Sequence, residues 1–232
     1  EVGETPLYVA VLNGALEATK LLIEKEADVN VEVESNVLPP LMVAIMNENE
    51  NKENSKEIIK LLIEGGANVN YKISDRDLDD GIDSRFTPLC YASNIDTIKL
   101  LIEKGANINN QSEKGLTVLM NVDSLAKEKL LIEKGANINA IDNKKNSVLL
   151  NILLKNKENP EVLEMTKLLM EKGVDLKLLN NEGKDALMIA SEIGIKELVN
   201  MLIEKGVDVK RRNQKGETSL MLAASSNSKE TV

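Results

Sequence analysis

The chain returns six times to one apolar phrase, and this repetition constrains its fold more than any other feature. The phrase reads Leu-Leu-Ile-Glu or a close variant, and its copies begin at Leu21, Leu61, Leu100, Leu130, Leu168 and Met201. In five copies a Gly stands two residues after the Glu, where a helix end needs a left-handed backbone, and Glu26 takes that place in the first copy. Each copy is therefore predicted to end a helix.

A second phrase precedes each of these copies and occurs once more near the end of the chain. It is three residues long: the first is Thr, Ser, Asp or Pro, and the third is always Leu. Its copies begin at Thr5, Pro39, Thr87, Thr117, Ser147, Asp185 and Thr218. Six of the seven first residues can accept hydrogen bonds from the free N–H groups of a helix start, and three copies place Pro in the first turn. Each copy is predicted to begin a helix, so helices opened by one phrase alternate with helices closed by the other.

A capped first helix with a small residue such as Ala10, a Leu-rich second helix and a Gly stop together resemble the ankyrin repeat. The resemblance covers all 232 residues as six full repeats and the start of a seventh. The approximate bounds are 1–34, 35–82, 83–112, 113–142, 143–180, 181–213 and 214–232. It implies an all-α ankyrin-repeat α-solenoid of helix-turn-helix units with β-hairpin-like fingers, in a single domain over 1–232. Such a unit is too small to fold alone, so stacking of neighbours supplies the core.

The chain departs from the family pattern at its histidine. Where ankyrin repeats usually carry His after Thr-Pro-Leu, this chain has Tyr8, Met42, Cys90, Met120, Leu150, Met188 and Met221. We expect apolar packing to fill that space, with Met as an adaptable filler and Cys90 as a core residue. A chain with no His and one Cys also has no Ser-His-Asp or Cys-His machinery, no His-ligated metal site and no internal disulfide.

Composition argues against further classes of function. No apolar segment approaches the roughly 18 residues that cross a bilayer, and a net charge of −9 argues against general affinity for nucleic acid. We find no Gly-rich phosphate loop and no nucleophile elbow, so we expect no catalysis and no cofactor. The lone Cys is compatible with a reducing cytoplasm, while export by a leader upstream of Glu1 stays open.

Asn and Lys are unusually frequent. Asn occurs 26 times, and Lys outnumbers Arg 25 to 4. We interpret both as the codon bias of an AT-rich genome rather than as chemistry.

The repeats differ in length, and function should concentrate where the period breaks. Repeats 2 and 5 gain 6 and 5 residues between their helices, at 47–56 and 155–160, and repeats 3 and 4 lose 3 there. The insertions are polar and of low complexity, which predicts solvated loops without a function. The shortened first helices of repeats 3 and 4 should alter the groove locally.

The connection between repeats 2 and 3 gains 9 residues, and we expect its segment 71–86 to form a long finger beside the concave surface. Three of the four aromatic residues, Tyr71, Phe86 and Tyr91, lie in or just after it. Aromatic side chains beside charge are typical of interface hot spots, although they could equally pack on the base of the finger. The resemblance places further contacts on finger tips and groove-facing first-helix positions. The residues so predicted to bind a partner are Tyr71, Asp83, Ser84, Phe86, Tyr91, Glu113, Lys114, Leu116 and Asn121, preceded along the chain by Ser35, Asn36 and Leu38 and followed by Asn143, Lys144, Asn146, Asn151, Asn181, Glu182 and Lys184.

The carboxylates Asp75, Asp77 and Asp79 alternate as in a calcium-binding loop. The match then fails, because Gly81 stands one position late and Phe86 occupies the place of the bidentate Glu. A weak calcium site is a minor alternative that thermal melting with calcium and with chelator would test.

These features predict a non-catalytic protein-interaction module, monomeric, that binds a partner through its concave face and the 71–86 finger. Residues 1–90 carry 18 acidic and 8 basic side chains, so the partner should present a basic surface. The alternative function is a regulatory or spacer arm of a larger polypeptide.

Overall fold

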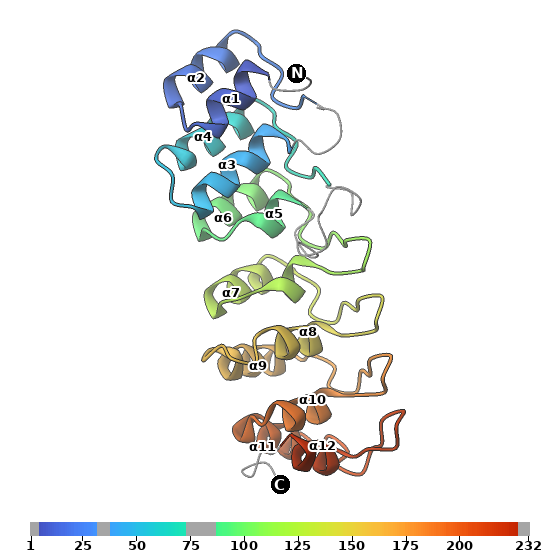
Figure 1. Ribbon diagram of the computed structural model, residues 1–232. Coiled ribbons are helices and arrows are strands. Elements are labelled where there is room, and N and C mark those ends of the chain that lie inside the picture. The colour runs from blue at the N-terminus through green and yellow to red at the C-terminus, as the bar shows by residue number, and fades with distance from the viewer. Residues whose placement is uncertain (1–4, 32–37, 73–86, 227–232) are drawn as a thin grey trace. The chain divides into compact units, whose positions relative to one another are not determined.

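The computed structural model describes residues 5–31, 38–72 and 87–226, in which helices are the only regular elements (Figure 1). The first helices of the repeats are α1 (Pro6–Leu12), α3 (Pro40–Asn49), α5 (Pro88–Tyr91), the 3₁₀ helix η2 (Val118–Asn121), α8 (Val148–Lys155), α10 (Ala186–Ile193) and α12 (Ser219–Ser225). The second helices are α2 (Leu16–Glu24), α4 (Ser55–Glu64), α6 (Ile95–Glu103), α7 (Leu125–Glu133), α9 (Val162–Glu171) and α11 (Lys196–Glu204). The predicted all-α ankyrin solenoid is confirmed.

The helices group into two compact units, 1–108 and 109–232. In the N-terminal unit α1, α3 and α5 pack in sequence as one layer, and α2 packs on α4 in the other. In the C-terminal unit the first layer is η2, α8, α10 and α12, and the second is α7, α9 and α11. The second Leu of most closing phrases, such as Leu62, and the Leu of most capping phrases, such as Leu41, are buried.

The helix starts form where the capping phrase predicts them. The side chains of Thr5, Ser147 and Asp185 accept hydrogen bonds from the N–H groups of Tyr8, Leu150 and Met188, at 3.1, 3.3 and 2.9 Å. Thr87 differs, because its hydroxyl donates to Cys90 Sγ at 3.3 Å.

The residues in the place of the family's histidine are mostly core, as expected. Met42, Cys90, Met120, Leu150 and Met188 are buried. Two positions differ: Tyr8 is half-buried, and Met221 is 50% exposed.

The predicted shortening of repeats 3 and 4 is confirmed, since α5 and η2 have 4 residues each. The prediction that both insertions are solvated loops is wrong in part. The first insertion begins within α3, which continues to Asn49, and its residues Asn47 and Ser55 are buried. Asn156 of the second insertion is buried as well.

The physical reason is that each insertion covers the shortened repeat beside it. In repeat 2, Asn49 Nδ2 donates to the Tyr91 carbonyl at 2.9 Å, and Thr97 Oγ1 donates to Glu48 at 2.9 Å. In repeat 5, Asn156 Nδ2 donates to the carbonyl of Val122 at 3.0 Å. A first helix of one turn leaves backbone groups without helical partners, and the neighbour's polar side chains satisfy them.

Asn residues also tie successive repeats together, so codon bias alone does not account for their frequency. Asn30 Nδ2 donates to the Gly66 carbonyl at 2.9 Å, and its Oδ1 accepts from the N–H of Asn68 at 2.7 Å. Asn70 and Asn109 bond the following repeat in the same way. We call this pair of hydrogen bonds an amide bracket. A side-chain amide can form it because its nitrogen donates a hydrogen bond while its oxygen accepts one.

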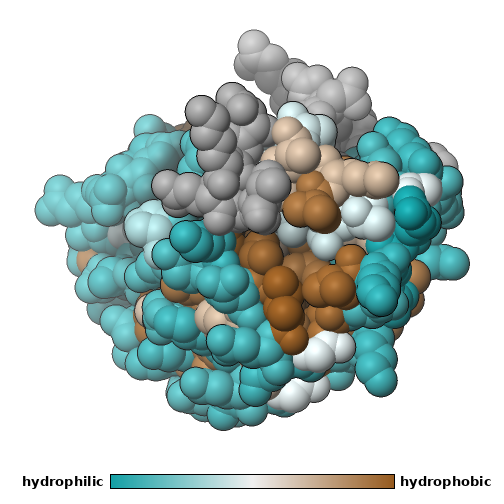
Figure 2. Space-filling model, turned by 90° about the horizontal axis from the view of Figure 1, so that it is seen from below, coloured by the Kyte–Doolittle hydropathy of each residue, from teal (hydrophilic) through white to brown (hydrophobic). Residues whose placement is uncertain are grey.

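The end of the C-terminal unit exposes apolar surface. Leu220 in α12 is 57% exposed, whereas Leu187 at the same position of α10 is buried. Figure 2 views the molecule from this end and shows apolar side chains gathered at the surface. No second helix follows α12 in the part of the chain that the structure describes, which leaves Leu220 and Ile203 uncovered.

Candidate protein-binding surface

Four loops of the C-terminal unit share one conformation, and we call them the finger loops: 112–116, 142–146, 180–184 and 213–217. In each, the N–H of the first residue donates to the carbonyl oxygen of the fifth, as Asp142 does to Asn146 at 3.0 Å. The side chain of the first residue accepts from the N–H of the fifth, as Asn180 does from Lys184 at 3.0 Å. Local side-chain bonds of this kind fix a tight turn without a sheet.

The finger loops are also joined to one another. The backbone N–H groups of Asn143, Asn181 and Gln214 donate to the carbonyls of Lys114, Lys144 and Glu182, each at 2.9 Å. Side chains at the tips are therefore presented in a row on connected backbone.

A groove lies between two finger loops and the first helices of the C-terminal unit. Its volume is about 230 Å³, and its lining includes Lys144, Lys184, Leu154 of α8 and Glu192 of α10. Leu154 is 47% exposed. The groove thus combines charge with an accessible apolar side chain.

Two ion pairs hold Lys184 in this groove. Its Nζ lies 3.2 Å from Glu182 Oε2 and 2.8 Å from Glu192 Oε2. Burial by itself would lower the pKa of Lys184, but the hydrogen bonds and charges of Glu192 and Glu182 outweigh it and raise the pKa above its usual value. Lys184 therefore stays protonated and cross-links the finger loop 180–184 to α10.

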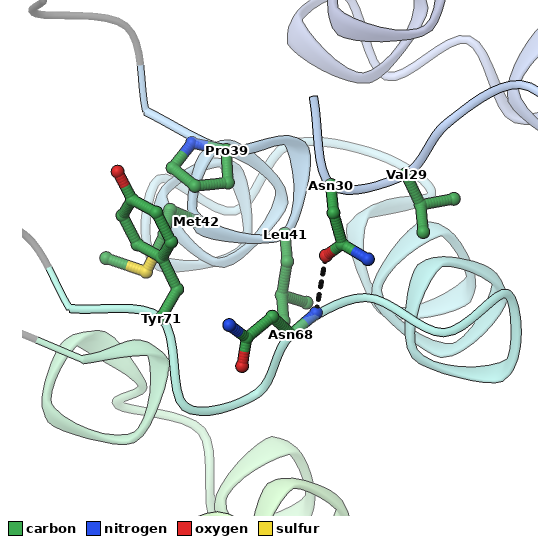
Figure 3. Close-up of a pocket in the computed structure, with 7 residues that line it drawn as sticks. All are labelled: Val29, Asn30, Pro39, Leu41, Met42, Asn68 and Tyr71. Atoms are coloured by element: carbon green, nitrogen blue, oxygen red, sulfur yellow. Dashed lines mark hydrogen bonds between the residues drawn. The ribbon is translucent and has the colours of Figure 1, made fainter. Parts of the chain in front are cut away.

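The N-terminal unit has a separate pocket of about 240 Å³ at the start of the long connection (Figure 3). Tyr71, Met42 and Pro39 lie along one side, and Asn30 and Val29 along the other. The amides of Asn30 and Asn68 already bond to backbone groups. Pro39, Leu41 and Met42 supply the apolar part of the lining, which an apolar side chain can contact.

The predicted contact residues fall into three groups. Glu113 and Lys114 are exposed at a finger tip, with Leu116 half-buried behind them, and Tyr71 lines the pocket of the N-terminal unit. Ser35, Asn36, Asp83, Ser84 and Phe86, with the calcium candidates Asp75, Asp77 and Asp79, lie outside the described residues.

Tyr91 and Asn121 are 6% and 8% exposed. The insertions of the neighbouring repeats cover them: Asn49 bonds the Tyr91 carbonyl, and Lys155 Nζ donates to the Asn121 carbonyl at 3.4 Å. They offer a partner little area, so we place the contacts elsewhere. Leu154 was not predicted from the sequence, because it lines the groove only where the finger loops 142–146 and 180–184 lie next to each other.

Two features of the described residues bear on other chemistry. They contain no cluster of three or more His, Cys, Asp or Glu side chains that could hold a metal ion. No helix among them is both long and apolar enough to span a membrane.

Comparisons with known proteins agree with this architecture. A family model described as ankyrin repeats in 3 copies matches residues 1–73, 39–112 and 155–232. The crystal structure of the ankyrin repeat domain of Bcl-3, described as a unique member of the IkappaB protein family, superposes with a TM-score of 0.71. That match has 26% identity and covers 96% of this chain and 95% of that one.

A curated relative, the BRCA1-associated RING domain protein 1 of Caenorhabditis elegans, is 38% identical over 69 residues. The match spans 30% of this chain and only 9% of the relative. Ankyrin repeats generally form protein-binding scaffolds and are typically non-catalytic. With repeats matched over most of its length and the fold of a known ankyrin domain, the chain belongs to the ankyrin-repeat family.

Proposed function

We propose that this protein is a non-catalytic interaction module that binds a partner protein through its concave face and through the 71–86 connection in the position of a finger. The observation that carries the proposal is the pocket of about 240 Å³ in the N-terminal unit. Tyr71, at the start of the connection, forms one of its walls beside Met42 (Figure 3). A pocket that combines apolar side chains with a few amides can accept an anchoring side chain from a partner.

The charge of this region indicates the kind of partner. Residues 1–90 hold 18 acidic and 8 basic side chains. A basic partner surface would be attracted to such a region, chiefly through a faster association rate and better discrimination against other partners. Salt screens exposed charges over about 8 to 10 Å, so binding should weaken as ionic strength rises.

The test is affinity capture with the chain, followed by titration of the captured partner against variants. Tyr71→Ala should lower affinity about tenfold, because loss of an aromatic anchor costs more than 1 kcal/mol. Phe86→Ala tests the remainder of the connection. Leu21→Ala is the control, since Leu21 is 55% exposed on the second-helix layer. Binding that is indifferent to both aromatic substitutions and to salt would overturn this assignment of the site.

A second function, as a regulatory or spacer arm of a larger polypeptide, is favoured by one observation. The matched segment of the Caenorhabditis elegans relative is a small part of a much longer protein. The full-length gene product decides between the two. A catalytic or membrane domain in it would make this chain an arm, whereas a product of little more than these repeats would leave binding as its whole activity.

A further inference from the structure

The finger loops of the C-terminal unit carry an excess of exposed cations. Lys114, Lys144, Lys145, Arg212 and Lys215 are all exposed at or beside the tips. The exposed carboxylates among them are those of Glu113 and Glu182.

Two further carboxylates of these loops are engaged in internal hydrogen bonds. Asp142 is buried and accepts bonds from Lys144 N, from Asn146 and from the Asn151 amide. Glu217 Oε2 accepts from Asn213 Nδ2 at 2.8 Å. The net charge that these tips present to solvent is therefore positive, in contrast to the acidic N-terminal region.

Several of these cations have no counter-ion among the described residues. Lys144, Lys145 and Lys215 form no ion pair in the described part of the protein. Lys144 and Lys215 occupy the third position of their finger loops. The inter-loop hydrogen bonds connect that part of the loops, so the two charges are held on one continuous edge.

The groove beside Lys144 adds an apolar component. Leu154 is 47% exposed and Ile189 lies in the lining of the same groove, whose volume is about 230 Å³. An apolar side chain of a partner can enter this space while an adjacent carboxylate meets Lys144.

We propose that the finger loops and groove of the C-terminal unit bind an acidic protein segment, in which Asp or Glu residues pair with Lys144 and Lys215 and an apolar side chain enters the groove beside Leu154. This inference deepens the proposed function and rests on it, since it takes the chain to be a protein-binding module. It assigns a second surface, whose positive charge is opposite in sign to the net charge of residues 1–90.

The chemistry of the groove favours a peptide over a nucleic acid. Its lining contains no aromatic residue on which a base could stack, and its two carboxylates, Glu182 and Glu192, are both paired with Lys184. An acidic peptide with an apolar residue satisfies the local cations and also uses the exposed Leu154.

The probe is a short labelled synthetic peptide rich in Asp and Glu with a central Leu, titrated into the full chain by fluorescence anisotropy. Three comparison probes separate the contributions of charge and of the apolar residue. One has Lys in place of every acidic residue, one has Gly in place of Leu, and one is a single-stranded DNA oligonucleotide.

The variants test the named residues directly. Lys144→Glu combined with Lys215→Glu should weaken binding of the acidic peptide by about tenfold or more, because attraction becomes repulsion at both positions. Leu154→Ala should weaken the peptide with Leu and leave the peptide with Gly unchanged. Lys172→Glu is the matched control, since Lys172 is an exposed residue just after α9 and belongs neither to the finger loops nor to the lining of the groove. Circular dichroism melting confirms that each variant is folded.

Saturable, salt-sensitive binding of the acidic peptide that is lost in the double variant and kept in Lys172→Glu supports the proposal. Equal binding of the lysine peptide, or no saturable binding of the acidic peptide, would overturn it. The proposal would also be overturned if the DNA oligonucleotide bound more tightly than the acidic peptide and Leu154→Ala had no effect. The finger loops would then be a polyanion site. Tyr71→Ala should leave the peptide's affinity unchanged, so a failed assignment around Tyr71 is distinguished from a failure here.

Discussion

Asn70 Nδ2 donates a hydrogen bond to the carbonyl oxygen of Gly105 at 2.9 Å, and Asn70 Oδ1 accepts the N–H of Asn107 at 2.8 Å. One amide thus holds two backbone groups of the following repeat, just after the end of α6. The same bracket recurs at Asn30 and Asn109. The stability of a solenoid depends on contacts between neighbouring repeats. These amides should therefore stabilise the interfaces between the repeats that they join.

Asn70→Ala should lower the free energy of unfolding by about 1–2 kcal/mol, because two hydrogen bonds to backbone groups are lost. Denaturant titration followed by circular dichroism measures the effect. The control is Asn200→Ala, at an exposed position of α11. Equal stability of the two variants would show that the bracket contributes nothing.

Asn47→Ala tests the insertion in repeat 2. Asn47 is 3% exposed, and its Nδ2 donates to the carbonyl of Val11 at 2.8 Å. The substitution removes the bond to the Val11 carbonyl and the bond that Lys52 Nζ donates to Asn47 Oδ1, while Gly14 N–H and Glu50 remain as partners of these two groups. We expect a loss of about 1–2 kcal/mol. Glu53→Ala, at an exposed residue of the same insertion, should change the melting temperature little. A solvated loop would make both variants equally harmless.

Glu128 of α7 is buried with 0% exposure, and neither carboxylate oxygen has a hydrogen-bond partner among the described residues. Burial raises its pKa from 4.5 to about 8, against a smaller opposing effect of Lys129. The folded state therefore keeps a proton that the unfolded state releases. The resulting stability is complete below the unfolded pKa and is lost, at up to about 1.4 kcal/mol per pH unit, as pH rises through the folded pKa.

Glu128→Gln should remove this pH dependence, so its melting temperature should fall less than that of the parent chain between about pH 5 and pH 8. Glu128→Ile introduces the residue found at the same position of α6, Ile98, and should stabilise the protein at pH 8 by about 1–4 kcal/mol. Glu133→Gln, at the exposed end of α7, is the control. Parallel pH profiles for Glu128→Gln and the parent chain would contradict the assignment.

Gly115→Ala should disrupt the contact between two finger loops. Gly115 has φ +78, and a Cβ there would lie 2.8 Å from Asn143 Oδ1 and 2.9 Å from Asn143 N. Strain in the left-handed region costs about 1–2 kcal/mol, and displacement of Asn143 from the Lys114 carbonyl adds to it. Gly135→Ala is matched, since it has φ +91 but open space around the new Cβ. Thermal melting should show the larger loss for Gly115→Ala, and an equal loss would mean that strain alone matters.

Much of the fold could be predicted from local sequence. The capping residue Asp185 and the Gly after each Leu-rich phrase act within one or two helical turns, so their effects can be read without a tertiary structure. The candidate surface was less predictable. Lys144 was expected at a finger tip, but its position beside Leu154 depends on two repeats stacking.

The sequence by itself determined the number and order of the helices, the ankyrin family and the places where repeats lengthen or shorten. Only the tertiary structure decided that each insertion covers a shortened neighbour, that Tyr91 and Asn121 are thereby buried, and that Asn residues bind repeats together. The reason is that these hydrogen bonds join residues 34 to 42 positions apart. Such partners become neighbours only when consecutive repeats are stacked, whereas helix ends depend on residues within a few positions.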